Sequence, residues 1–217
     1  MNLPWGDEKT VQFITNVGLI TSDGPYGFNI MAAEWTNHVS YNPGLIAVHL
    51  GFNKATTENI KKTKKFGVSL ASTNQSVLVS VAGGNSAKDT DKISALKDLG
   101  FKFYKGKNGI LMVKDAALNV ECRLIKTMKL GDHIMFVGEI SDVSISGKEP
   151  LAYHKGRYWR LTETLKKPSD KDGEEIKNII LKYKKTWSKS QIYTNFSFLY
   201  ISLNLINNQM FKNNGFS

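Results

Sequence analysis

The chain has 217 residues and a formal net charge of +10 at pH 7, with 41% hydrophobic and 22% charged residues. This composition is typical of a globular protein with a buried core and excludes a wholly disordered chain. Cys122 is the single cysteine, so an intramolecular disulfide is excluded and a reducing compartment is expected. No run reaches the roughly 20 apolar residues of a membrane-spanning helix, and residues 1–10 lack a secretory pattern, so we expect a cytoplasmic protein.

The positive charge is concentrated in two segments. Residues 53–66 contain five lysines against Glu58, and residues 164–217 contain nine lysines against four acidic residues. Such runs are usually solvated faces. They could also attract phosphate-bearing ligands. We expect no nucleic-acid binding, because the aromatic residues do not alternate with the lysines as a stacking surface requires.

The first 100 residues predict short strands with a few helices. Strands are expected at residues 11–20, 29–35, 45–50 and 66–71, with a dense turn signal at 21–25. Residues 56–65 favour a helix capped by Thr56 or Thr57, because Glu58 lies in its first turn and the lysines gather towards its end. Residues 75–82 favour a short helix, and residues 86–100 a loop and a helix that ends at Gly100.

The next 60 residues predict a hairpin and two further strands. Residues 120–124 and 134–140 alternate between apolar and polar side chains, and a Gly131-Asp132 turn lies between them. Residues 142–146 and 153–161 are expected to form separate strands. Many short strands with close turns and few helices favour an antiparallel barrel or sandwich.

The C-terminal part differs in composition. Residues 166–173 have the composition of a linker, and residues 174–187 predict an amphipathic helix with an apolar face formed by Ile176, Ile179, Ile180, Tyr183 and Trp187. Residues 192–206 are aromatic and apolar, and fit a strand or a helix equally well. We expect them to pack on the barrel or on a partner, with a membrane surface as the alternative.

Two segments have the composition of a binding site. In residues 29–36, the small side chains of Ala32 and Ala33 would let a flat ring approach the backbone, although they equally suit a strand packed closely under a neighbour. In residues 53–57, Lys54 and two threonines lie at the expected start of a helix. Unpaired N–H groups and the helix dipole make such a start a phosphate site, whereas simple capping by threonine needs no ligand.

Two further features are ambiguous by themselves. Residues 83–92 (GGNSAKDTDK) could be a capped surface helix or could bring lysines to an anionic group. His133 directly follows the Gly131-Asp132 turn. A lone histidine is more often a packed or solvent-facing residue than a catalytic one. The four histidines show no metal-ligand spacing, so no metal site is expected.

Taken together, three segments resemble the flavin reductase-like family of FMN-binding split barrels. They are residues 119–140, which include the turn Leu130-Gly131-Asp132-His133, residues 29–40, and residues 150–161 (PLAYHKGRYWRL). Flavoredoxin is one member of this family. Residues 86–92 are similar to the family pattern S-G-R-x-x-D-K, with Ala87 and Lys88 in place of glycine and arginine. Ala32 replaces the usual hydroxyl residue of the ring-lining segment.

The resemblance implies a role for each group of residues. The flavin ring would be lined by Asn29, Ile30, Met31, Ala32, Ala33, Trp35 and Ser40. The phosphate would be held by Lys54 and Thr56, with Asn53 and Thr57 beside them, and the loop would contribute Ser86, Lys88 and Lys92. Lys92 would also stabilise negative charge on the reduced ring, and His133 would position NAD(P)H.

The resemblance also implies the fold and the activity. We expect a mainly β protein with an FMN-binding split barrel over residues 1–163, a few peripheral helices, and a C-terminal extension over residues 164–217. The function implied is an FMN-dependent oxidoreductase that passes electrons from NAD(P)H to free flavin, ferric iron or a protein, as a homodimer. The alternatives are a non-enzymatic flavoredoxin-type electron carrier and a flavin-free basic barrel that binds polyanions.

Overall fold

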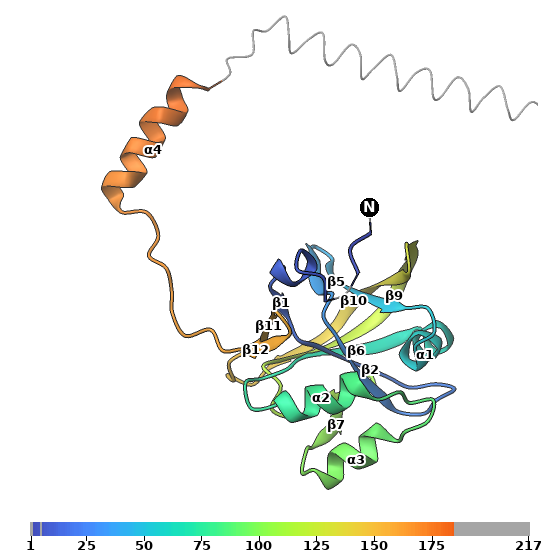
Figure 1. Cartoon of the computed structure of the whole chain (residues 1–217). Helices are drawn as coiled ribbons and strands as arrows, with labels where there is room; N and C mark the ends of the chain where they lie inside the picture. Colours follow the sequence, from blue (N-terminus) through green and yellow to red (C-terminus); the bar gives the residue numbers. More distant parts are fainter. Residues whose placement is uncertain (1, 5, 185–217) are drawn as a thin grey trace, which may run out of the picture. The chain divides into compact units, whose positions relative to one another are not determined.

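The computed structural model describes residues 2–4 and 6–184 (Figure 1). The chain divides into two units, residues 1–162 and 163–217. The sequence predicts two parts that fold separately, residues 1–163 and 164–217, and this stays a prediction. Trp187 and the apolar stretch 192–206 lie outside the described residues. In the part that the structure describes, no helix is long and apolar enough to cross a membrane.

Unit 1 consists mainly of short strands. The strands are β1 (Thr15–Asn16), β2 (Gly18–Ser22), β3 (Asn29–Ala33), β4 (Thr36–Tyr41), β5 (Gly44–Gly51), β6 (Lys65–Leu70), β7 (Phe103–Lys105), β8 (Leu111–Val113), β9 (Leu118–Leu130), β10 (His133–Ile145), β11 (Ala152–His154) and β12 (Arg157–Trp159). The helices of this unit are the 3-10 helix η1 (Thr10–Gln12), α1 (Ala55–Thr63), α2 (Ser76–Gly84) and α3 (Lys92–Asp98).

Seven strands form one antiparallel sheet in the order β3-β2-β6-β9-β10-β5-β4. Its two edge strands, β3 and β4, are consecutive in the chain and only Glu34 and Trp35 separate them. The sheet must therefore curl until its edges adjoin. Gly18 of β2 supports this closure, because a Cβ there would overlap with the side chain of Thr36 at the start of β4. The result is a barrel that is split between β3 and β4.

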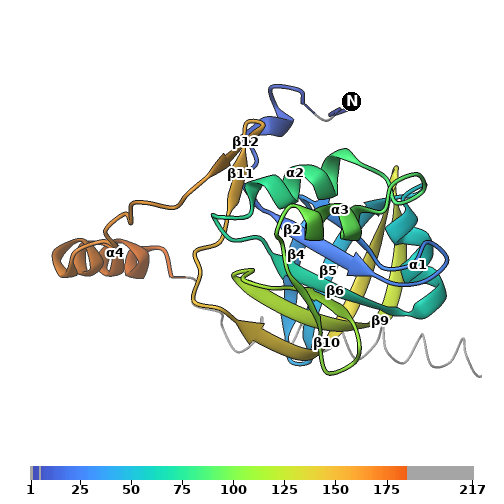
Figure 2. The same cartoon turned by 90° about the horizontal axis from the view of Figure 1, so that it is seen from below.

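Two cores lie on opposite faces of this sheet. Leu19 of β2 packs with apolar residues of α2, α3 and β8, whereas the adjacent Ile20 packs with Phe66 and Phe136 inside the barrel. Successive side chains of a strand point to opposite faces, so β2 is buried on both sides. Ile60 places α1 against the barrel core. Figure 2 shows α2 and α3 next to each other beside β2.

The helix after β5 begins without the predicted threonine cap. Lys54 is the N-cap residue of α1, and no side chain bonds the free N–H groups of the first turn. Thr57 instead donates from its hydroxyl to the backbone carbonyl of Gly51, at 2.9 Å. The threonine therefore holds the preceding loop, and the capping prediction is wrong.

The predicted hairpin is longer than the alternating pattern indicated. Strands β9 and β10 each have 13 residues and meet at Gly131-Asp132, where Gly131 has a positive φ of 56°. Asp142 was expected to begin a separate strand but lies within β10. A register shift between Ile140 and Asp142 interrupts the alternation without ending the strand, so the pattern predicted a break that is only a bulge.

The closing segment is a hairpin and not one strand. Lys155 and Gly156 have positive φ angles of 51° and 71°, and they connect β11 to β12. Two consecutive positive φ angles are characteristic of a type I′ turn. Strand β11 also pairs with β1, which gives a small three-stranded sheet.

The described part of unit 2 contains α4 (Asp170–Lys182). Ser169 and Asp172 form a capping box at its start. The predicted linker 166–173 is therefore partly helical. Ile176, Ile179, Ile180 and Tyr183 are exposed.

Candidate functional site

The segments predicted to bind a ligand converge around β3. This edge strand contacts α1, α2 and α3, so the helix starts and loops of those three elements lie along one side of the barrel. Asn29 at the start of β3 donates from Nδ2 to the hydroxyl of Thr56 in α1, at 2.8 Å. Both side chains are buried. The Oδ1 atom of Asn29 accepts no hydrogen bond from a described residue.

Asn59 fixes the turn that leads into β3. Its Oδ1 accepts from the backbone N–H of Tyr26 at 3.0 Å, and its Nδ2 donates to the carbonyl of Gly27 at 3.0 Å. Asn59 is completely buried. The role of Asn59 was not predicted from the sequence, because the polar pattern of a helix does not indicate which of its polar side chains is buried.

The side chains of β3 do not all face a ligand. Ile30 and Ala33 are buried in the two opposite cores. Ala32 lies against α2, since a Cβ on Gly83 would be 3.3 Å from the Cβ of Ala32. Met31 is half-buried against the barrel core. Because β3 is an edge strand, the contacts that it can offer on its outer side come from backbone groups.

Lys92 is a buried cation at the first residue of α3. It is 3% exposed, and its Nζ donates to the carbonyls of Ala82 at 3.2 Å and Asn85 at 3.1 Å. These carbonyls lie at the end of α2, where the helix dipole is negative. Burial and, to a smaller extent, the charge of Lys54 lower the pKa of Lys92 to about 8, while Asp89 opposes the change. The two lysines are therefore close enough to repel each other.

The loop between α2 and α3 is tied to α1. Ser86 is exposed, and its hydroxyl accepts from the backbone N–H of Lys88 at 3.1 Å. Lys88 forms an ion pair of 2.8 Å with Glu58 and lies 5.5 Å from the ring centre of Tyr26. The hydrogen bond with Glu58 raises the pKa of Lys88. Lys88 thus already has an acidic partner, while Asn53 and Lys54 are exposed on the loop before α1.

His133 meets Trp35 next to this cluster. The ring centres of Trp35 and His133 are 4.7 Å apart, and that of His49 lies 6.3 Å from Trp35. His133 pairs with Gly51 across the sheet, directly before the loop that contains Asn53 and Lys54. Asp132 lies 2.7 Å from Nδ1 of His133, and this hydrogen bond lowers the pKa of Asp132. Trp35 is 47% exposed.

Ser40 lies apart from the other predicted residues. It pairs with Leu45 near the far end of β4, four residues beyond Thr36, which is about 13 Å along a strand.

A cavity of about 530 Å³ is lined by other residues than those predicted to bind a ligand. It lies between Ser76 at the start of α2 and Arg157, Tyr158 and Trp159 of β12. Within the described ranges, no group of three or more His, Cys, Asp or Glu side chains could hold a metal ion.

Comparison with known proteins places this geometry in a family. The family model described as flavin reductase like domain matches residues 10–162. An uncharacterised protein of Pyrococcus abyssi is 31% identical over 113 residues, 52% of this chain and 63% of that protein. The NADH-dependent FMN reductase AsuE2 of Streptomyces nodosus subsp. asukaensis is 30% identical over 127 residues, 58% of this chain and 66% of the reductase.

A solved structure agrees with these relatives. The flavin reductase PheA2 has a TM-score of 0.64 and 28% identity, over 75% of this chain and 100% of that chain. The chain spans less than two thirds of the length of the first of the sequence relatives. The mainly β split-barrel fold expected from the sequence is confirmed. Because the family match covers most of the chain, this protein belongs to the family of flavin reductase like domains.

Proposed function

We propose that this protein is a flavin-dependent oxidoreductase that binds FMN along the outer side of β3 and takes electrons from NADH or NADPH. The observation that carries the proposal is the convergence of Lys54, Lys92 and the Asn29–Thr56 pair on one edge strand. The electrons pass to an acceptor such as free flavin, ferric iron or a protein. The family and the flavin reductase relatives support this proposal.

The residues at β3 suit a flavin nucleotide in three ways. Lys54 and Lys92 repel each other, and neither forms an ion pair with an acidic side chain in the part of the chain that the structure describes, so an anion between them would lower their free energy. Asn29 retains a buried acceptor without a partner. The outer edge of β3 offers backbone donors and acceptors to the polar edge of a flat ring.

Each residue has a defined task in the proposed site. Lys54 and the free N–H groups at the start of α1 would hold the phosphate, with Asn53 beside them. Thr56 would act through Asn29, because its hydroxyl already accepts a hydrogen bond from that residue. Lys92 would face the anionic part of the cofactor. When bound, FMN supplies a ring that accepts hydride and releases electrons singly or in pairs.

The exposed aromatic cluster would receive the nicotinamide. Trp35 offers a flat surface, and His133 is oriented by Asp132. Hydride transfer depends on proximity and orientation, and it requires no acid or base at this position. We therefore assign His133 a positioning role.

The absorption spectrum of the purified protein tests the proposal directly. The spectrum is recorded alone, after addition of FMN, and after addition of NADH and then NADPH without oxygen. We expect flavin bands that shift on binding and bleach with a reduced nicotinamide. Flavin bands that persist would instead favour an electron carrier, and failure to take up flavin would contradict the proposed site.

We further propose that two copies of the chain associate. The long β9–β10 hairpin exposes apolar side chains that a partner subunit would cover, namely Ile125, Met128, Leu130, Val143 and Ile145. Light scattering after size-exclusion chromatography should give twice the mass of the chain. The variant with Ile125→Lys and Met128→Lys should elute as a monomer, whereas a monomeric wild type would contradict this proposal.

A further inference from the structure

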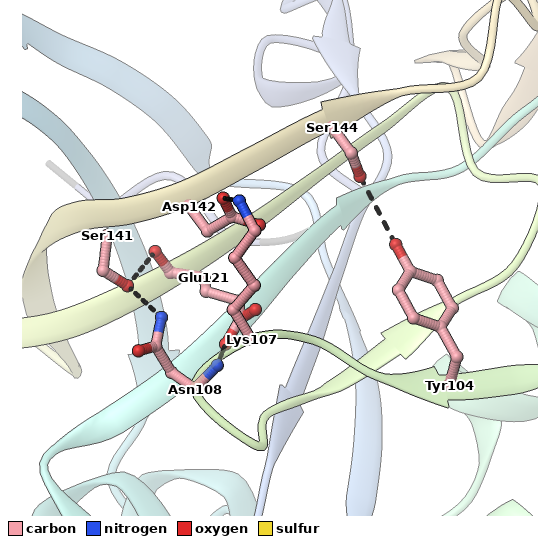
Figure 3. Close-up of polar contacts among 7 residues, drawn as sticks. All are labelled: Tyr104, Lys107, Asn108, Glu121, Ser141, Asp142 and Ser144. Atoms are coloured by element: carbon pink, nitrogen blue, oxygen red, sulfur yellow. Dashed lines mark hydrogen bonds and ion pairs between the residues drawn. The ribbon is translucent and has the colours of Figure 1, made fainter.

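A second polar site lies between the β7–β8 hairpin and strands β9 and β10 (Figure 3). At its centre is Glu121 of β9, which is 2% exposed. The Oε2 atom of Glu121 accepts a hydrogen bond of 2.8 Å from the backbone N–H of Asn108. The Oε1 atom is also buried and accepts no hydrogen bond from any residue that the structure describes. The hydrogen bond to Asn108 accounts for Oε2 but not for Oε1. A buried carboxylate oxygen without a partner costs free energy, so Oε1 needs a separate explanation.

The hairpin leaves room for this carboxylate. A Cβ on Gly106 would overlap with Oε1 of Glu121, so a side chain at position 106 would displace the carboxylate. Asn108 donates from Nδ2 to the hydroxyl of Ser141 at 3.1 Å, and Ser141 donates to the backbone carbonyl of Glu121 at 3.0 Å. Figure 3 shows these contacts around Glu121.

Glu121 lines a cavity of about 260 Å³. Tyr104 and Met112 supply its apolar wall, and Asp142 and Ser144 supply polar groups. Asp142 lies directly opposite Glu121 in the pairing of β9 with β10, so both carboxylates are on one face of the sheet. The hydroxyls of Tyr104 and Ser144 are 3.3 Å apart, and they form the other end of the cluster in Figure 3.

Glu121, Asp142 and Ser144 supply acceptor oxygens to the lining, which also contains Lys105 and Lys107. The ammonium of Lys105 lies over the ring of Phe28, 5.3 Å from its centre. The ammonium of Lys107 is 2.6 Å from Oδ1 of Asp142, which shows that this wall accommodates a primary ammonium. The side chain of Lys107 is 80% exposed, so the buried oxygen of Glu121 is left for another donor. A primary ammonium carries three N–H donors and no acceptor, which matches Glu121, the second oxygen of Asp142 and the Ser144 hydroxyl. A divalent cation fits less well, because no group of three or more His, Cys, Asp or Glu side chains among the described residues could hold a metal ion.

We propose that this cavity is a binding site for a small molecule with a primary ammonium group, whose N–H donates to Oε1 of Glu121. The site is distinct from the proposed flavin site. Strand β9 is separated from β3 by β6 and β2, which corresponds to about 14 Å at the usual strand spacing. The proposal therefore stands independently of the proposed function.

Calorimetric titration of the full chain with ethanolamine and with choline tests the proposal. The two molecules share a hydroxyethyl group, but the trimethylated nitrogen of choline has no N–H donor. We expect ethanolamine to bind at one site per chain and choline not to bind. Glu121→Gln should weaken ethanolamine binding by about tenfold or more, because it replaces the charged acceptor in the cavity with an amide donor. Its remaining oxygen can still accept from Asn108, so the variant should fold.

Glu139→Gln is the matched control. Glu139 is on β10 and forms an ion pair with Arg123 outside the cavity, so this variant should bind ethanolamine as the wild type does. Thermal unfolding of both variants establishes that each is folded. Absence of ethanolamine binding to the wild type, equal binding to Glu121→Gln, or equal binding of choline would each overturn the proposal. Competition of Ca²⁺ for the same site would overturn the assignment to an amine.

Discussion

Asn29 of β3 donates a hydrogen bond of 2.8 Å to the hydroxyl of Thr56 in the first turn of α1, and water reaches almost none of either side chain. This contact joins the edge strand of the barrel to the helix that begins beside Lys54. Asn29 and Thr56, both predicted from the sequence to bind the cofactor, thus form one unit. The role of Thr56 in that unit is to hold Asn29.

We expect Thr56→Val to lower the free energy of unfolding by about 1–3 kcal/mol, because the buried Nδ2 of Asn29 loses its acceptor. Urea denaturation monitored by tryptophan fluorescence measures this loss. Thr63→Val is the control, since Thr63 bonds only backbone carbonyls at the end of α1 and is less buried. In a double-mutant cycle with Asn29→Ala, additive losses would show that the two side chains are not coupled.

Lys54→Ala should weaken FMN binding by about fivefold and leave the unfolding midpoint unchanged, because an exposed charge pair contributes up to about 1 kcal/mol. Quenching of flavin fluorescence during titration gives the dissociation constant. Lys62→Ala removes the same charge from the last turn of α1 and should have little effect. Equal weakening in both variants would mean that net charge, and not a phosphate site at the start of α1, governs affinity.

Stability should increase with pH above the lowered pKa of Lys92. Below about pH 8 both folded and unfolded chains carry the proton, so the full cost of burying the charge is present. Above about pH 8 the folded chain loses the proton before the unfolded chain does. The cost of burying the charge then disappears as the pH approaches the ordinary pKa of lysine. Relative to Lys92→Met, the wild type should gain about 2 kcal/mol between about pH 7 and about pH 9.5. A pH-independent difference between the two proteins would show that Lys92 is not a buried cation.

His133→Ala should raise KM for NADH while leaving the FMN dissociation constant within about twofold, because the histidine lies against Trp35 and not at the start of α1. Steady-state NADH oxidation and flavin titration measure the two quantities. His38→Ala is the control, since His38 is exposed on β4 and contacts Tyr41 instead. A parallel loss of FMN affinity in His133→Ala would place the histidine in the cofactor site.

The sequence predicted most elements through local patterns. Gly131-Asp132 located the β9–β10 turn, and the lysines and Glu58 located α1. Two errors arose where one residue changes the local geometry. The bulge at Asp142 interrupts the alternating pattern in the same way as the end of a strand. The positive φ of Lys155 cannot be predicted from the aromatic pattern around it, which indicates one continuous strand.

Burial of polar side chains could not be predicted in the same way. The burial of Lys92 depends on how α3 packs against the end of α2, which no local pattern indicates. Glu121 alternates with the core residues Val120 and Cys122, so the pattern places it on the outer face of the sheet. Only the β7–β8 hairpin, which folds back over that face, makes it a buried carboxylate.

The short connection between the two edge strands has a consequence for aggregation. Because Glu34 and Trp35 join β3 to β4, the two edges of the sheet are held near each other. A cut or a long insertion at this connection would separate the edges and expose two rows of unpaired backbone groups. Such edges pair readily with other chains, so opening the split of the barrel would make this protein vulnerable to strand exchange.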